Sequence, residues 1–170
     1  MTIATLLFLA VLPVLAIVGG LRDLLTMKIP NWISGLMVLG FFPAALMVGL
    51  PPLAVAAHVG VGALALVVAA GMFALRWIGG GDAKLLAAAC LWLGLTGSGV
   101  FLLYTGLIGG AFCLALLVAR GHVQPLLARA PGWVVHLMEP KGDIPYGVAI
   151  AAGALMAYPT SPLVTAFLAG

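Results

Sequence analysis

Apolar residues run along the chain in long blocks, and polar residues gather in the short stretches between the blocks. Crossing the ~30 Å hydrocarbon core of a bilayer takes about 20 helical residues, and the blocks are close to this length. The pattern therefore predicts an all-α, polytopic membrane protein with about six spanning helices. They are expected at residues 2–20, 32–49, 53–75, 83–95, 99–119 and 144–168, with turns at Pro51-Pro52 and in the run GLTGSG at 94–99.

The composition supports this prediction. Hydrophobic residues make up 65% of the chain and charged residues 6%, whereas a soluble domain has about 25% charged residues. No soluble extension, internal repeat or low-complexity segment interrupts the blocks, so we expect one integral-membrane domain over residues 1–170. A cleaved signal peptide would carry a basic stretch before its apolar core. The first basic residue, Arg22, follows the first block, which we therefore expect to be a mature span.

The basic residues lie on one side of the predicted membrane. All seven fall in or beside alternate connections: Arg22 and Lys28 in the first, Arg76 and Lys84 flanking the turn of the third, and Arg120, Arg129 and Lys141 in the fifth. The positive-inside rule makes this side cytoplasmic and puts both termini outside. The fifth connection, 120–142, mixes Leu, Val and Trp with Arg and His, which predicts a segment at the membrane interface, either a connector or a lid.

Four acidic residues are expected on or near this cytoplasmic side: Asp23, Asp82, Glu139 and Asp143. Asp23 follows the first span and Asp82 begins the fourth, so the two lie at the same depth and are candidates to meet. Each also has a simpler interpretation. Asp23 can be a solvated charge that balances a basic neighbour, and Asp82, after three glycines, can be the N-cap of a helix.

Two carboxylates that meet in a low-dielectric setting cannot both remain ionised, so the pair holds one proton. The ionised member then takes a proton from water while the protonated member donates a hydrogen bond to the scissile carbonyl, which is the chemistry of an aspartic peptidase. The N-terminal end of a helix favours a charged carboxylate, so we expect Asp82 to be the ionised member. This mechanism uses no metal and no cofactor, and the sequence has no His, Cys and carboxylate cluster at metal-ligand spacing. Nothing in the sequence indicates a nucleic-acid partner.

Three stretches resemble motifs of the type IV prepilin peptidase family, which are intramembrane-type aspartic peptidases. DLLTMKIPN at 23–31 resembles the stretch with the family's first aspartate, GGGDAKLLAA at 79–88 its GxGD motif, and IPYGVAIAAG at 144–153 its final-span motif. The resemblance covers nearly the whole chain, with the motifs in the right order. It implies that Asp23 and Asp82 are the catalytic pair. It also gives supporting roles to the other motif residues, Lys28, Pro30, Asn31, Gly79, Gly81, Lys84, Pro145 and Gly147.

The resemblance implies a substrate and a location as well. The substrate is a type IV or Flp-type prepilin, or a pseudopilin, for pilus assembly or protein secretion. Its short leader is cut at the cytoplasmic face of a bacterial plasma membrane, next to the substrate's apolar helix. Larger members of the family carry an N-terminal domain with paired CxxC motifs, associated with methylation of the new N-terminus. This sequence has no CxxC motif, so it resembles the short branch that serves Flp (tight-adherence) pili.

Three other functions fit parts of the pattern. A small proton- or ion-coupled transporter also has intramembrane acids, but it is expected to place them near the middle of the bilayer. A non-catalytic pilus-assembly subunit would tolerate the loss of either aspartate. An enzyme of phospholipid metabolism that binds a metal through aspartates would need clustered Asp residues, which the chain lacks.

Overall fold

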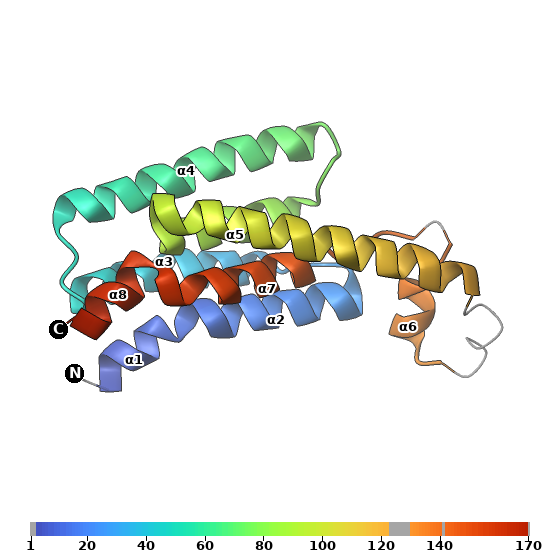
Figure 1. The fold of residues 1–170 in the computed structure, drawn as a ribbon, viewed down its shortest axis with the longest axis horizontal. Helices are drawn as coiled ribbons and strands as arrows, with labels where there is room; N and C mark the ends of the chain where they lie inside the picture. The colour runs from blue at the N-terminus through green and yellow to red at the C-terminus, as the bar shows by residue number, and fades with distance from the viewer. Residues whose placement is uncertain (1–2, 123–129, 141, 170) are drawn as a thin grey trace.

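In the computed structural model, which describes residues 3–122, 130–140 and 142–169, every element of regular secondary structure is a helix (Figure 1). Within these ranges, four helical stretches are long and apolar enough to cross a membrane: Ile3–Thr26, Pro52–Ala74, Gly80–His122 and Gly147–Ala169. A shorter apolar helix covers Asn31–Met47. The predicted all-α, polytopic membrane fold is therefore confirmed.

Most of the helices follow one another through short connections. In chain order they are α1 (Ile3–Leu9), α2 (Val11–Thr26), α3 (Asn31–Met47), α4 (Pro52–Ala74), α5 (Gly80–His122), α6 (Gly132–Leu137), α7 (Gly147–Ala157), the 3₁₀ turn η2 (Tyr158–Thr160) and α8 (Pro162–Ala169). Helix α4 is apolar around its circumference and exposes Leu64, Val67 and Val68. A helix of this kind is suited to contact with lipid rather than water.

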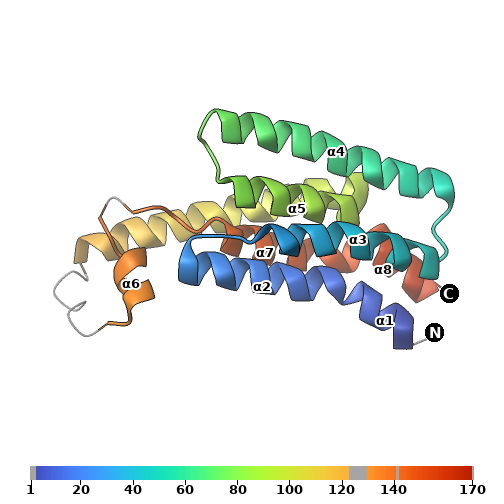
Figure 2. The same ribbon diagram turned by 180° about the vertical axis from the view of Figure 1, so that it is seen from behind.

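The 43-residue helix α5 consists of two arms. Gly94 interrupts it with a φ of 64°, which glycine adopts without strain, and the chain reverses direction there (Figures 1 and 2). His58 of α4 closes this reversal, because its Nδ1–H donates to the carbonyl of Leu91 at 2.8 Å and its ring lies 2.9 Å from where a Cβ of residue 94 would be. The predicted turn at 94–99 is therefore wrong in extent, since residues 95–99 are already helical.

Two predicted span boundaries also need correction. The first span continues past residue 20 to Thr26, so Asp23 lies inside α2. The last span begins at Gly147 rather than 144, and η2 interrupts it because Pro159 and Pro162 have no backbone N–H to continue the helix. With the two arms of α5 counted separately, and α1–α2 and α7–α8 each taken as one, the described residues form six helical segments at the places of the six predicted spans.

Aromatic side chains fill the core at the end of the bundle where the termini lie. Trp92 is fully buried, its Nε1–H donates to the carbonyl of Met37 at 2.8 Å, and the Tyr158 ring lies edge-on to it. The Tyr158 hydroxyl donates to the carbonyl of Leu9 at 2.7 Å. That carbonyl lacks its usual helical donor because Pro13 stands four residues later. These bonds join α1, α3, α5 and η2.

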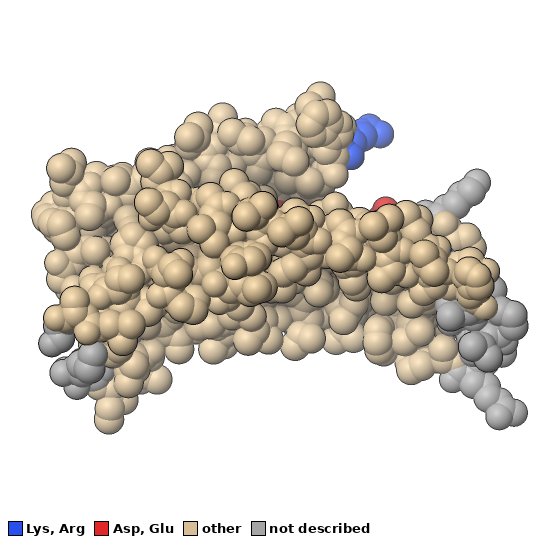
Figure 3. Space-filling view, in the orientation of Figure 1, with Lys and Arg blue, Asp and Glu red and all other residues tan. Residues whose placement is uncertain are grey.

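The opposite end of the bundle collects the segments that carry the motif residues. The end of α2 and the beginnings of α5 and α7 lie toward this end, to the right in Figure 1, and we call it the aspartate end. The face drawn in Figure 3 shows Lys and Arg only near the passage from α4 to α5, and its left third shows no charged side chain. Arg129 and Lys141 of the charge pattern, and residues 123–129 of the predicted interfacial segment, lie outside the described residues.

Candidate active site

Asp23 lies one turn before the end of α2, and its carboxylate is held inside the protein. The helix ends where Met27 takes a left-handed conformation with a φ of 53° and donates its N–H to the carbonyl of Asp23. The Asp23 side chain is 6% exposed, and its Oδ2 accepts a 2.7 Å hydrogen bond from the N–H of Gly147 at the start of α7. A Cβ at position 147 would lie 2.8 Å from that oxygen, so glycine is what lets the backbone approach the carboxylate.

Asp82 is the third residue of α5, which corrects its expected role as the N-cap. The helix begins at Gly80, and Oδ2 of Asp82 reaches back to accept a 3.2 Å hydrogen bond from the N–H of Gly79, as in a capping box. The other oxygen, Oδ1, is buried and has no hydrogen-bond partner among the described residues. Buried acceptors of this kind are uncommon, and this one is available to a water molecule or a substrate.

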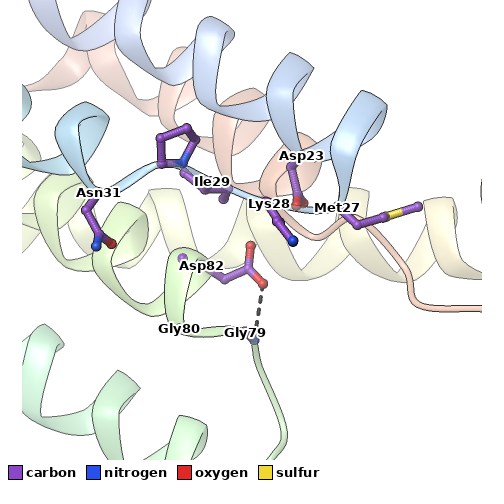
Figure 4. A pocket seen from close by; sticks show the side chains of 10 residues that line it. Asp23, Met27, Lys28, Ile29, Asn31, Gly79, Gly80 and Asp82 are labelled. Carbon is purple, nitrogen blue, oxygen red and sulfur yellow. Dashed lines mark hydrogen bonds between the residues drawn. The ribbon is translucent and has the colours of Figure 1, made fainter. Parts of the chain in front are cut away.

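Asp23 and Asp82 line one cavity of about 530 Å³ at the aspartate end. Figure 4 shows Asp23 entering it from α2 and Asp82 from α5, with both carboxylates directed into the space between the helices. A second cavity, of about 540 Å³, lies between the connection from α4 to α5 and the segment that precedes α7. Both cavities are lined by Asp23, Met27, Gly79 and Asp82. The structure thus brings the two aspartates together where two spaces meet.

Ile29 is the side chain on which the three motif stretches converge, a role that was not predicted. It is buried, and Cβ atoms at positions 81 and 147 would each lie 2.9 Å from its side chain. Gly81 and Gly147 therefore let the starts of α5 and α7 pack directly on Ile29. The next residue, Pro30, has extended angles (φ −63°, ψ 140°), and α3 begins immediately after it at Asn31.

The other predicted supporting residues occupy different places. Lys28 lines the cavity of the aspartates and points into it in Figure 4, and Pro145 is buried beside the second cavity. Lys84 lines neither cavity; its Nζ donates to Oδ1 of Asn31 at 2.8 Å. The side chain of Asn31 makes no cap hydrogen bond to α3 and instead joins α3 to α5.

A buried arginine fixes the segment that leads into α7. Arg120, expected in the fifth connection, lies in the last turn of α5 and is 6% exposed. Its guanidinium donates to the carbonyls of Leu137, Gly142 and Asp143 over 2.8–3.0 Å. These bonds tie α5 to α6 and to the chain just before Pro145. The signal in the sequence is an arginine at the end of a long apolar run, since a buried charge needs several partners.

The pair of carboxylates has the components of general acid–base catalysis. Each carboxylate accepts one backbone N–H, from Gly147 for Asp23 and from Gly79 for Asp82, and both face the same cavity. Within the described part of the chain, no group of three or more His, Cys, Asp and Glu side chains is placed to hold a metal ion.

A comparison with known families bears on the first two motif stretches. The model of the type IV leader peptidase family matches residues 10–114, which is more than half of the chain. The chain belongs to the type IV leader peptidase family. The match includes Asp23 and Asp82, and the motif stretch at 144–153 lies beyond it. No curated protein and no solved structure matches this leader peptidase. The predicted family is therefore confirmed, and with it a peptidase activity.

Proposed function

We propose that this peptidase is an aspartic endopeptidase that removes the leader from type IV or Flp-type prepilins and pseudopilins, with Asp23 and Asp82 as its catalytic pair. The observation that carries the proposal is the cavity at the aspartate end, into which α2 and α5 direct two carboxylates. Family membership accounts for peptide-bond hydrolysis, and the two carboxylates account for the acid and the base that such hydrolysis needs.

The surroundings of the two carboxylates give them different roles. Asp82 lies at the N-terminal end of α5, where the helix dipole favours a negative charge, and its Oδ1 is without a partner in the described part of the chain. Asp23 lies near the C-terminal end of α2, where the dipole disfavours a negative charge. We therefore assign Asp82 as the base that accepts a proton from the attacking water, and Asp23 as the protonated acid.

The protons balance over one catalytic cycle. Water adds to the scissile carbonyl carbon as one of its protons passes to Asp82, and the proton of Asp23 passes to the carbonyl oxygen, which gives a neutral tetrahedral diol. The C–N bond then breaks as Asp82 protonates the leaving amine and Asp23 takes a proton back from the diol. In the intermediate Asp23 carries the charge, and the N–H of Gly147 stabilises it there. The pair ends with the single proton with which it began.

The charge pattern supports a cytoplasmic position for this site. Lys28 and Arg76 line the cavities at the aspartate end, and the positive-inside rule places that end in the cytoplasm, with both termini outside a bacterial plasma membrane. We further propose that residues 1–170 form one integral-membrane domain, which cuts the substrate beside its apolar helix. A transporter fits less well, because its acids are expected at mid-bilayer, whereas Asp23 and Asp82 lie at helix ends.

Replacing either aspartate by asparagine tests the proposal. Asp23→Asn and Asp82→Asn preserve the shape of the side chain, so both variants are expected to fold, and each is expected to leave a co-expressed prepilin uncut. Because the two residues act as one unit, the double variant is expected to be no worse than either single variant. The measurement is the fraction of precursor processed in membranes at matched enzyme levels.

The control is Glu139→Gln, which changes an exposed carboxylate that lines neither cavity and is expected to leave processing near the wild-type level. Processing near the wild-type level by either Asp variant would refute the assigned mechanism and favour a non-catalytic role in assembly.

A further inference from the structure

An apolar groove begins beside the proposed catalytic pair and runs along the bundle. It has a volume of about 660 Å³ and lies between α3, α4 and the first arm of α5. Its walls are aliphatic or small, among them Gly35, Val38 and Leu39 of α3, Ala63 and Leu66 of α4, and Ala87 of α5. Asn31 lines both this groove and the cavity of the two aspartates, so the two spaces adjoin.

Two features of the groove make it suited to bind another helix. Gly35 and Ala63 are exposed, and a Cβ at position 35 would meet no atom within 4 Å, so the backbones here are open to the close approach of a partner helix. Ser34 also lines the groove; its side chain is 7% exposed and its hydroxyl has no hydrogen-bond partner among the residues that the structure describes. A buried hydroxyl without a partner is costly, and an occupant with a polar backbone or side-chain atom at this depth would satisfy it.

We propose that this groove holds the apolar helix of the substrate, the segment that directly follows the cleaved bond. The inference rests on the proposed function. A helix with one face in the groove begins beside Asn31, and the chain that precedes it passes the two aspartates and enters the second cavity. The first N–H groups of a helix have no acceptors within that helix. The side-chain oxygen of Asn31, held by Lys84, is placed to accept one of them.

Filling the groove tests the proposal. Gly35→Leu puts an aliphatic side chain into open space, so it is expected to fold and to exclude the substrate's helix. Gly60→Leu is the control, because position 60 of α4 has equally open space and does not line the groove. With purified enzyme in detergent and a full-length type IV prepilin as substrate, Gly35→Leu is expected to raise KM and to lower kcat/KM about tenfold relative to Gly60→Leu.

The same comparison is then made with a precursor peptide that spans the cleaved bond but lacks the apolar helix. Here the effect of Gly35→Leu is expected to be at least about fivefold smaller, because the groove has no helix to bind. If the wild-type enzyme cuts the prepilin but Gly35→Leu matches Gly60→Leu on it, the groove is not the docking site and the proposed function stands. If the wild-type enzyme leaves the prepilin uncut, the proposed function and this inference both fail.

Photo-crosslinking identifies the occupant directly. A benzoylphenylalanine that replaces Phe42, an exposed aromatic residue of the same groove, leaves position 35 open. Irradiated in membranes that contain the co-expressed prepilin, this variant is expected to form an adduct whose mass is the sum of the two proteins. An adduct only with a second copy of the enzyme would make the groove an oligomer interface, and an adduct only with lipid would make it a lipid-facing surface. Either result would overturn the proposal.

Discussion

Gly147→Ala is expected to impair catalysis strongly, although it replaces neither aspartate. The new methyl group would lie 2.8 Å from both Cβ and Oδ2 of Asp23 and 2.9 Å from Cδ1 of Ile29, whereas ordinary contacts begin at 3.4 Å. The start of α7 must therefore move away from α2 by about 0.6 Å, the difference between these distances. This movement lengthens the 2.7 Å hydrogen bond from the N–H of residue 147 to the Asp23 carboxylate.

The displacement of α7 is expected to lower both the folding stability and kcat. Overpacking of a well-packed site costs about 1–3 kcal/mol of folding stability. A misplacement of a catalytic group on the order of 1 Å costs about 100-fold in rate, so a shift of about 0.6 Å is expected to lower kcat by roughly 10- to 100-fold. The expected change in KM is smaller, because Gly147 does not line the groove proposed to bind the substrate's helix.

Steady-state cleavage of a purified prepilin and thermal unfolding, both in detergent, measure these effects separately. Gly71→Ala is the matched control, because position 71 of α4 is exposed and a Cβ there meets no atom within 4 Å. A kcat for Gly147→Ala within twofold of that for Gly71→Ala would show that the distance between α7 and Asp23 does not limit the reaction.

Four further outcomes are expected. Cleavage of prepilin is expected to survive EDTA, since the proposed mechanism uses two carboxylates, and loss of activity restored by added metal would contradict it. Arg120→Lys, which keeps the charge but loses the forked bonds to three carbonyls, is expected to lower kcat about tenfold in the same cleavage assay. Tyr158→Phe is expected to lower the free energy of unfolding by about 1–3 kcal/mol, because it leaves the Leu9 carbonyl unpaired far from the aspartates, with kcat changed by less than about threefold. A cysteine at position 138 is expected to be labelled only from the cytoplasm and one at position 51 only from outside, and the reverse pattern would refute the proposed topology.

The membrane fold could be predicted because its signal is local. A block of apolar residues as long as the bilayer is thick can only be satisfied by a helix that crosses it, since every backbone group must find a partner within the segment. The same reasoning placed Asp23 and Asp82 at one depth from their positions at the ends of spans. Their meeting in one cavity is a property of the fold that this placement allowed but did not require.

The errors in the predicted boundaries share a physical cause. Glycine and serine in the run GLTGSG indicate a turn in a soluble protein. In an apolar segment, however, a helix satisfies the backbone hydrogen bonds within the segment itself. Five of these six residues are therefore helical, and only Gly94 breaks the helix. An aspartate near the start of a helix can accept backbone N–H groups in two positions: as the N-cap residue, or as the third helical residue, whose carboxylate bonds to the N–H of the N-cap. The glycines before it fit both, so the sequence alone could not choose between them.

Other features depend on contacts between distant segments and left little trace in the local pattern. Arg120 was predicted in a connection because charged residues usually lie there. In the structure it is buried, because it donates hydrogen bonds to backbone carbonyls 17 to 23 residues later in the chain. Asn31 follows Pro30 at the start of α3, where an asparagine commonly caps its own helix, but Lys84 binds its side chain instead. In each case the polar atom is satisfied as expected, and only the partner differs.

Ile29 explains why the three motif stretches act together. Its side chain separates the start of α5 from the start of α7, and both helices contact it through a glycine at the point of contact. Asp82 lies one residue after Gly81, and Asp23 binds the N–H of Gly147, so the distance between the carboxylates depends on the width of this one side chain. A bulkier residue at position 81 or 147 would widen the spacing. Two carboxylates share a proton only while they stay close, so wider spacing would let both ionise independently and remove the acid that the proposed reaction needs.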